Sequence, residues 1–167
     1  IVITGLGGLC GLGTNAGAIW NAMRAGESAI GELTTPNLRD TKTRIGAEIR
    51  ELPDSDVDRR RLVTMDRFAL LAAIAAGEAL KDAGIVVPDF DAGRIGAVVG
   101  TGIFGALTAD ENYFALLVEG KSRPNVFTVP RIMPSAAAGQ VSMNYGLKGP
   151  VFGVTSACAS SNHAFIA

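Results

Sequence analysis

The chain alternates short, continuous apolar runs with longer segments in which apolar residues recur at helical spacing. The apolar runs at residues 1–6, 95–99 and 151–155 have the length and composition of buried strands, and residues 44–49 favour one more strand. Strands that lack an alternating polar face lie in sheets that helices cover on both sides. The pattern therefore predicts an α/β layer fold.

Helices are predicted in the segments between these strands. Their ends are marked by glycines, which readily take the left-handed conformation that often closes a helix. We expect helices at residues 14–25, 65–83, 106–119 and 134–145, followed by Gly26, Gly84, Gly120 and Gly146 respectively. Either Thr14 or Asn15 can cap the first of them, and one further helix begins after Cys158.

Composition and charge narrow the class of protein. With 48% hydrophobic and 19% charged residues the chain is too apolar for disorder, and a net charge of −1 lacks the basic excess of a nucleic-acid-binding protein. No stretch reaches the roughly 18 uninterrupted apolar residues of a membrane span, and the N-terminus lacks the basic region of a signal peptide. Two cysteines indicate a reducing compartment rather than a disulfide framework. We expect a soluble, cytoplasmic protein.

The ends of the sequence fall inside predicted elements. The chain begins within a predicted strand, without an initiator Met, and stops within a predicted helix. Domain boundaries normally fall in exposed polar linkers. We therefore expect residues 1–167 to form one part of a longer protein.

Two segments come close to phosphate-binding motifs. Residues 11–16 match G-x-G-x-x-A, but residues 26–31 are not the second strand with an acidic end that a dinucleotide site needs, so a tight strand-to-helix turn is favoured. Residues 115–122 are one residue from a P-loop, but they have a helical pattern and no glycine-rich loop after a strand. With one histidine and no cysteine pair at ligand spacing, no metal site is expected.

Residues 151–163 carry the strongest chemical signal. They predict a strand, a sharp turn and the start of a helix, with Cys158 at the turn among small residues. Small neighbours permit the strained elbow that presents a nucleophile, and nearby backbone N–H groups favour a thiolate and can receive an oxyanion. From this pattern alone, a reactive Cys158 and a buried, inert one both stay open. Cys10, in a glycine-rich turn, is interpreted as a small apolar filler.

His163 is the one histidine and so the obvious candidate base for Cys158. It lies five residues further along the same predicted helix, and at about 100° per residue the two side chains point about 140° apart. A general base must come within hydrogen-bond reach of the group that it deprotonates. We therefore expect the base for Cys158 to come from outside this sequence.

The ordered motifs resemble the β-ketoacyl-acyl-carrier-protein synthases of the elongating class, over essentially the whole chain. The matching segments are residues 1–7 (IVITGLG), Trp20, 26–28 (GES), 65–68 (MDRF), 99–103 (VGTGI), 146–150 (GLKGP) and 155–161 (TSACASS). The resemblance implies the N-terminal half of a thiolase-like layered α/β fold. It also implies an acyltransferase in which Cys158 takes an acyl group as a thioester before decarboxylative Claisen condensation with malonyl-carrier protein, in fatty-acid or polyketide elongation.

The resemblance implies further site residues and partners. Ile103, beside Phe104, matches a residue that lines and gates the acyl pocket, and Thr128, Val129 and Ala157 fall on or near positions that border it. Substrates would arrive on the phosphopantetheine of an acyl-carrier protein, with no separate cofactor. The family's two catalytic histidines, lysine and second oxyanion donor have no counterpart here, so these residues alone are not expected to complete the condensation.

Surface contacts follow from the same resemblance. Strand 151–155 would pair with its mate across a homodimer interface, which would cover an apolar edge. Residues near the expected carrier-protein surface are Arg59, Arg60, Arg61, Lys121 and Arg123. A solvated charged face explains any one of them equally well.

Two other functions compete with condensation. One is a non-catalytic partner subunit of the chain-length-factor type, which lacks the cysteine, so Cys158 argues against it. The other is a cysteine hydrolase, which would need a histidine and an acid further along the chain.

Overall fold

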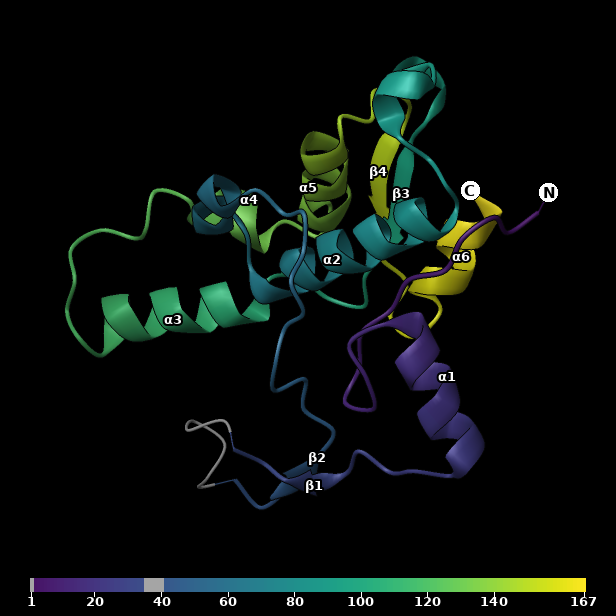
Figure 1. Cartoon of the computed structure of the whole chain (residues 1–167). Helices are drawn as coiled ribbons and strands as arrows, with labels where there is room; N and C mark the ends of the chain where they lie inside the picture. The colour runs from purple at the N-terminus through teal and green to yellow at the C-terminus, as the bar shows by residue number, and fades with distance from the viewer. Residues whose placement is uncertain (1, 35–40) are drawn as a thin grey trace. The chain divides into compact units, whose positions relative to one another are not determined.

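The computed structural model describes residues 2–34 and 41–167 (Figure 1). The α-helices are α1 (Ala16–Ala25), α2 (Arg67–Asp82), α3 (Ala106–Leu117), α4 (Thr128–Ile132), α5 (Ala136–Tyr145) and α6 (Ser160–Ile166). The strands are β1 (Gly31–Glu32), β2 (Ile45–Gly46), β3 (Ala97–Gly100) and β4 (Val151–Val154). Short 3-10 helices are η2 (Arg59–Thr64), η3 (Val87–Asp89) and η4 (Ala92–Arg94).

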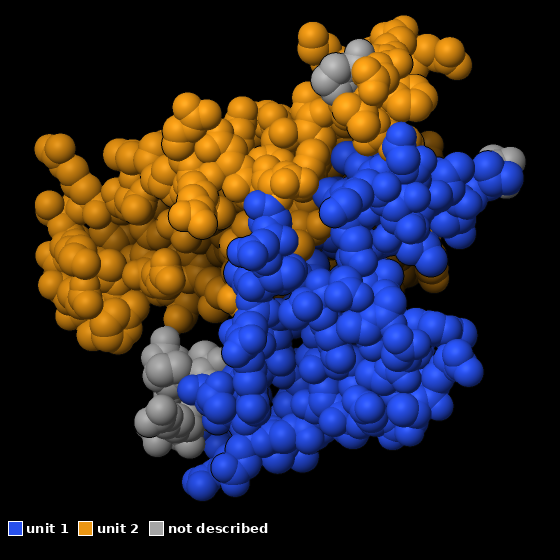
Figure 2. All heavy atoms as spheres, viewed as in Figure 1, with its two compact units in different colours: residues 1–55, 75–84 blue, residues 56–74, 85–167 orange. Residues whose placement is uncertain are grey.

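The chain divides into two compact units, coloured separately in Figure 2. The first comprises residues 1–55 and 75–84, and the second comprises residues 56–74 and 85–167. The predicted nucleophile lies in the second unit.

Helix α1 and the short β1–β2 pair characterise the first unit. Asn15 caps α1 by accepting a hydrogen bond from the backbone N–H of Ala18 at 2.7 Å, so Asn15 rather than Thr14 starts the helix. Gly26 closes it with a φ of 71°, as predicted. Strands β1 and β2 pair antiparallel, and the strand expected over residues 44–49 is shortened to two residues.

The strand predicted at residues 1–6 is wrong for the part that the structure describes. Residues 2–9 form no regular element, and Val2 and Ile3 are exposed. The backbone N–H groups of Leu6 and Gly8 donate instead to the carboxylates of Asp82 and Glu78 on α2, at 2.9 Å each. A strand needs a neighbouring strand for these donors, and the described residues provide none.

The second unit has the predicted helix–sheet–helix layering. Strands β3 and β4 pair in parallel, with Ala97 opposite Val151 and Gly100 opposite Val154. Helices α5 and α6 both pack against these strands, and Figure 1 shows them on either side of the pair. The α/β prediction is confirmed for this unit, and the predicted strands and helices over residues 95–166 differ from those observed by a few residues at their ends.

Small residues allow the layers to approach closely. Ala137 and Ala138 on α5, and Ala69 and Ala73 on α2, are fully buried. A Cβ on Gly153 in β4 would stand 3.0 Å from the Cα of Ser135, just before α5. The small residues of α5 and β4 thus let this helix pack directly against the strands.

Asp66 joins the start of α2, which lies in the second unit, to the start of α3. It is 3% exposed, and its carboxylate accepts a hydrogen bond from the backbone N–H of Phe68 at 3.3 Å. Helix α2 therefore begins at Arg67, two residues after the predicted start at Met65. It also accepts from the N–H of Thr108 in the first turn of α3, at 2.8 Å. One carboxylate therefore satisfies open backbone donors of two helix starts.

Candidate active site

The predicted elbow is present between β4 and α6. Cys158 is exposed in the turn that follows β4, two residues before α6 begins at Ser160. Ala157, immediately before it, has a φ of 49° and is the one non-glycine residue with positive φ in the described part of the chain. Such strain in a residue with a Cβ gathers at functional sites. Among the described residues, Cys158 thus lies exposed on a strained turn, as the reactive alternative requires.

Ser160 holds the inner side of this turn. It is 3% exposed, and its hydroxyl oxygen accepts from the backbone N–H of Ser156 at 2.8 Å. The same hydroxyl lies 2.7 Å from the carbonyl oxygen of Ala157 and 3.0 Å from that of Thr101, to which it can donate. The elbow is thus tied both to itself and to the end of β3.

His163 points to Ser156 rather than to the thiol. Its Nδ1 lies 2.8 Å from the hydroxyl oxygen of Ser156, and the tautomer of the ring decides which group donates. The structure describes no hydrogen bond between His163 and Cys158. This geometry agrees with the prediction that His163 is not the base for Cys158.

Gly100 brings α6 against the end of β3. A Cβ there would stand 2.5 Å from the carbonyl carbon of Ser160 and 2.6 Å from the backbone nitrogen of Ser161. Beyond it, the N–H of Thr101 donates to the carbonyl of Val154 at 3.0 Å and continues the parallel ladder. The absence of a side chain at Gly100 is therefore what lets the elbow lie beside the sheet.

The segment 101–105 reaches from the elbow to α4. At one end, a Cβ on Gly102 would lie 3.6 Å from the carbonyl oxygen of Ala157. At the other end, the N–H of Gly105 donates to the carbonyl of Ile132 at 3.1 Å. Ile103 and Phe104 lie between these contacts and are 58% and 38% exposed.

Helix α4 carries the other two residues expected near the acyl pocket. The hydroxyl of Thr128 can donate to the carbonyl of Asn125 at 2.6 Å or to Oδ1 of Asn112 on α3 at 2.9 Å, while Val129 is exposed. The apolar pattern of the sequence does not predict this short helix. The signal that could have found it is Asn125, whose side chain accepts from the N–H of Phe127 at 2.8 Å in an Asx turn.

The basic residues expected at a carrier-protein surface lie in two segments of the second unit. Arg59, Arg60 and Arg61 form the start of η2, and Lys121 and Arg123 lie in the loop after α3. Two of the five are ion-paired. Arg60 binds Asp58 at 3.0 Å, and Lys121 binds Glu119 at 2.8 Å.

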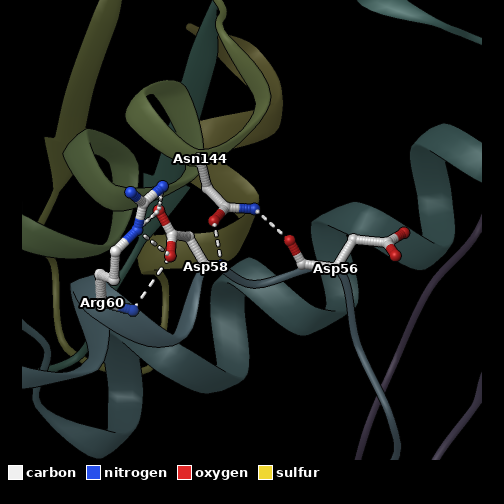
Figure 3. A network of polar contacts seen from close by, with 4 residues as sticks. All are labelled: Asp56, Asp58, Arg60 and Asn144. Carbon is white, nitrogen blue, oxygen red and sulfur yellow. Dashed lines mark hydrogen bonds and ion pairs between the residues drawn. The ribbon is translucent and has the colours of Figure 1, made fainter.

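A polar network fixes the chain just before η2 (Figure 3). The N–H of Asp58 donates to Oδ1 of Asn144 on α5 at 3.0 Å, and Nδ2 of Asn144 donates to the carbonyl of Asp56 at 3.3 Å. The hydrogen bond from Arg60 lowers the pKa of the Asp58 carboxyl, and Asp58 in turn raises the pKa of Arg60. The network holds the arginine-bearing turn in place.

The glycine-rich segment of the first unit forms the predicted tight turn. The N–H of Cys10 donates to the carbonyl of Gly13 at 2.9 Å, and that of Gly13 donates back at 3.1 Å. The N–H groups of Ala16 and Ala18, which start α1, bind Glu78 and Asn15. The N–H groups that start α1 are thus occupied within the protein, which argues against a phosphate cradle at this helix.

The remaining candidate segments form no second reactive site in the part of the chain that the structure describes. Cys10 is partly buried and borders an open groove of about 500 Å³ in the first unit. Residues 115–117 are helical, which confirms that the P-loop-like segment is not a loop after a strand. Among the described residues, no three potential ligands from His, Cys, Asp and Glu gather at a metal-binding distance, and no helix is long and apolar enough to cross a bilayer.

The layered α/β unit and its cysteine elbow define the N-terminal half of a thiolase-like fold. The model of the β-ketoacyl synthase N-terminal domain family matches residues 1–167, and the chain belongs to this family. The chain is 58% identical over 164 residues to nodulation protein E of Rhizobium sp. (strain N33), covering 98% of this chain and 41% of that protein.

Two further relatives agree with this assignment. The 3-oxoacyl-[acyl-carrier-protein] synthase 2 of Coxiella burnetii is 34% identical, with 98% of this chain and 40% of that protein covered. The crystal structure of a β-ketoacyl synthase from Burkholderia phymatum STM815 superposes with a TM-score of 0.79 at 27% identity, covering 98% of this chain and 41% of that one. The chain thus spans about two fifths of the length of these relatives.

Proposed function

We propose that the intact protein is a β-ketoacyl-acyl-carrier-protein synthase and that Cys158 is its nucleophile. The observation that carries this proposal is the exposed position of Cys158 on the strained turn between β4 and α6, in a chain of the β-ketoacyl synthase family. Residues 1–167 would be its nucleophile-bearing N-terminal part.

The proposed reaction has two steps, acyl transfer to Cys158 and then condensation. The Cys158 thiolate attacks the thioester carbonyl of an acyl-carrier protein and forms a new C–S bond. The old C–S bond breaks, and the carrier's phosphopantetheine leaves as a thiolate that takes a proton. Malonyl-carrier protein then loses CO₂, and its carbanion attacks the Cys158 thioester and releases the cysteine thiolate. The backbone N–H of Cys158 stabilises the oxyanion that forms at the carbonyl. No cofactor is needed beyond the carrier-bound phosphopantetheine.

The nucleophile is tested by labelling and by substitution in the intact protein. Iodoacetamide should alkylate exposed Cys158 much faster than partly buried Cys10. Cys158→Ala should abolish formation of the acyl-enzyme, measured by mass spectrometry of the intact protein, whereas Cys10→Ala should retain it. Equal labelling of the two thiols together with acylation of the Cys158→Ala protein would refute the assignment.

The acyl pocket is proposed to be bordered by Ile103, Phe104, Thr128, Val129 and Ala157. Support comes from the run 101–105, which contacts the elbow at one end and α4 at the other. Ile103→Phe should shift the preferred acyl chain to shorter lengths, because the larger side chain occupies the space of the distal carbons. The kcat/KM for a series of acyl chains measures this, and an unchanged series would contradict the gating role.

The acyl-carrier protein is proposed to dock near Arg59, Arg60, Arg61, Lys121 and Arg123. Opposite charge on an acidic partner would raise the encounter rate. Since Arg60 is ion-paired with Asp58, reversal of Arg59 and Arg61 to Glu gives the sharper test. This variant should raise the KM for carrier-linked substrate but not for a small acyl thioester, whereas the matched control Arg94→Glu should change neither. An unchanged KM would contradict docking at this surface.

A homodimer formed through β4 is a further part of the proposal. Within the described residues, β4 pairs with β3 on one edge alone, and Val151 and Phe152 are 37% and 40% exposed. Phe152→Glu should convert a dimer into a monomer in sedimentation equilibrium. A monomeric unsubstituted protein would refute this arrangement.

We also propose a cytoplasmic location, which cell fractionation tests.

The relatives favour a role in nodulation. Identity to nodulation protein E of Rhizobium sp. (strain N33) is 58%, compared with 34% to the synthase of Coxiella burnetii. The intact gene should therefore restore nodulation to a rhizobial strain that lacks nodulation protein E. Failure to do so, together with rescue of a strain that lacks 3-oxoacyl-[acyl-carrier-protein] synthase 2, would favour general chain elongation instead.

A further inference from the structure

Ser156 is held by two side chains of α6 at once. Its backbone N–H donates to the hydroxyl oxygen of Ser160 at 2.8 Å, and its own hydroxyl shares a hydrogen bond of 2.8 Å with Nδ1 of His163. Ser160 and His163 are three residues apart and so lie on one face of the helix. The main chain and the side chain of Ser156 are therefore both fixed, two residues before Cys158.

The residue between Ser156 and Cys158 has a strained backbone. Ala157 separates Ser156 from Cys158 and has a φ of 49°. A backbone in this region persists only when the surrounding contacts hold it, because an alanine released from them returns to negative φ. The Ser160 hydroxyl also lies 2.7 Å from the carbonyl oxygen of Ala157 itself. Helix α6 therefore contacts both the strained residue and Ser156, the residue before it.

We propose that Ser156 and His163 are positioning residues that hold Cys158 in the orientation needed for acyl transfer. This inference rests on the proposed function. It gives the one histidine of the sequence a role other than proton transfer, since its ring faces Ser156 and not the thiol. Loss of the Ser156–His163 hydrogen bond would let the turn relax and move the Cys158 sulfur relative to its own backbone N–H.

Two reactions of the same thiol separate positioning from stability. Acylation requires the sulfur and the backbone N–H to meet one carbonyl group in a defined geometry. Alkylation by iodoacetamide occurs at a tetrahedral carbon and develops no oxyanion. A misoriented but folded elbow therefore loses acylation selectively, whereas an unfolded one changes both reactions.

The experiment uses the intact protein with two disruptive variants, Ser156→Ala and His163→Leu. Their conservative counterparts are Ser156→Thr, which keeps the hydroxyl, and His163→Asn, which keeps a hydrogen-bonding atom close to the place of Nδ1. Asn162→Ala, exposed on the same helix, is the matched control. Mass spectrometry measures the rate of Cys158 acylation by a hexanoyl thioester of N-acetylcysteamine, and the rate of alkylation by iodoacetamide.

Acylation should fall about tenfold in both disruptive variants, because small misplacements of reacting groups have large effects on rate. Alkylation should stay within about twofold, and both conservative variants and the control should acylate at close to the unsubstituted rate. Parallel loss of both reactions, unchanged acylation, or no recovery in the conservative variants would overturn the positioning role. If the unsubstituted protein forms no thioester at Cys158, the proposed function itself fails.

Discussion

Substitution of Gly100 by alanine should both destabilise the second unit and impair the elbow. The new Cβ would stand 2.5 Å from the carbonyl carbon of Ser160, whereas ordinary contact begins at 3.4 Å, so the start of α6 would have to withdraw by about 0.9 Å. The obstructing atoms are backbone atoms and cannot rotate away. We expect the free energy of unfolding to fall by about 3 kcal/mol, at the upper end of the range for overpacking.

The same displacement has a chemical consequence. Ser160 would move away from the carbonyl of Thr101 and the N–H of Ser156, which it binds at 3.0 and 2.8 Å. Acylation of Cys158 in the folded protein should therefore fall as well. Urea denaturation followed by circular dichroism measures the first effect, and mass spectrometry of the acyl-enzyme below the unfolding transition measures the second.

Gly139 offers a matched control on α5 in the same unit. Apart from its chain neighbours and the backbone of its own helix, no atom of the described residues lies within 4 Å of the position that its Cβ would take. Alanine in a helix interior is favoured over glycine by about 0.5–1 kcal/mol, so Gly139→Ala should raise stability and leave acylation unchanged. If Gly100→Ala matched the unsubstituted protein in both assays, the close approach of α6 to β3 could not be what places the elbow.

Three further changes probe polar contacts of the second unit. Asp66→Ala removes the acceptor that lies 2.8 Å from the buried N–H of Thr108. The free energy of unfolding, measured by urea denaturation, should fall by about 3 kcal/mol. A loss below about 0.5 kcal/mol would contradict the role of this carboxylate. Burial raises the pKa of Tyr145 above its ordinary 10.0, so stability is fully present below pH 10 and should fall as the pH rises further. Tyr145→Phe should flatten that profile, and an unchanged slope would count against it. The hydrogen bond from Arg60 lowers the pKa of Asp58 below 3.8, so its contribution is present above that pH and is lost as the pH falls through the folded-state pKa. Arg60→Gln should make Asp58 titrate at a higher pH by NMR, and an unmoved titration would exclude the ion pair as the cause.

Local signals in the sequence were sufficient for most of the secondary structure. Gly26, Gly84, Gly120 and Gly146 were predicted from their places after apolar helical patterns, and all four have φ between 66° and 71°. The turn at Cys158 was likewise predicted from the small residues that surround it. Capping, left-handed glycines and apolar periodicity act within a few neighbouring residues, so the linear sequence contains the whole interaction.

Contacts between distant residues decided the rest. The backbone N–H groups of Leu6 and Gly8 bind carboxylates of α2 that are more than 60 positions away in the sequence. An apolar run does not reveal such partners, and the strand predicted there was wrong. The partners of Ser156 could not be predicted either, although they are near in sequence, because a helix register and a positive φ at Ala157 together bring them within reach.

The sequence by itself determined that an apolar α/β chain places a cysteine on a turn between a strand and a helix. The tertiary structure decided how that cysteine is held. Gly100 and Ser160 are 60 positions apart, and whether their backbones meet depends on the parallel pairing of β3 with β4 and on the packing of α6 against both. Such contacts form only once the layers assemble, since no single segment carries both halves of the interaction.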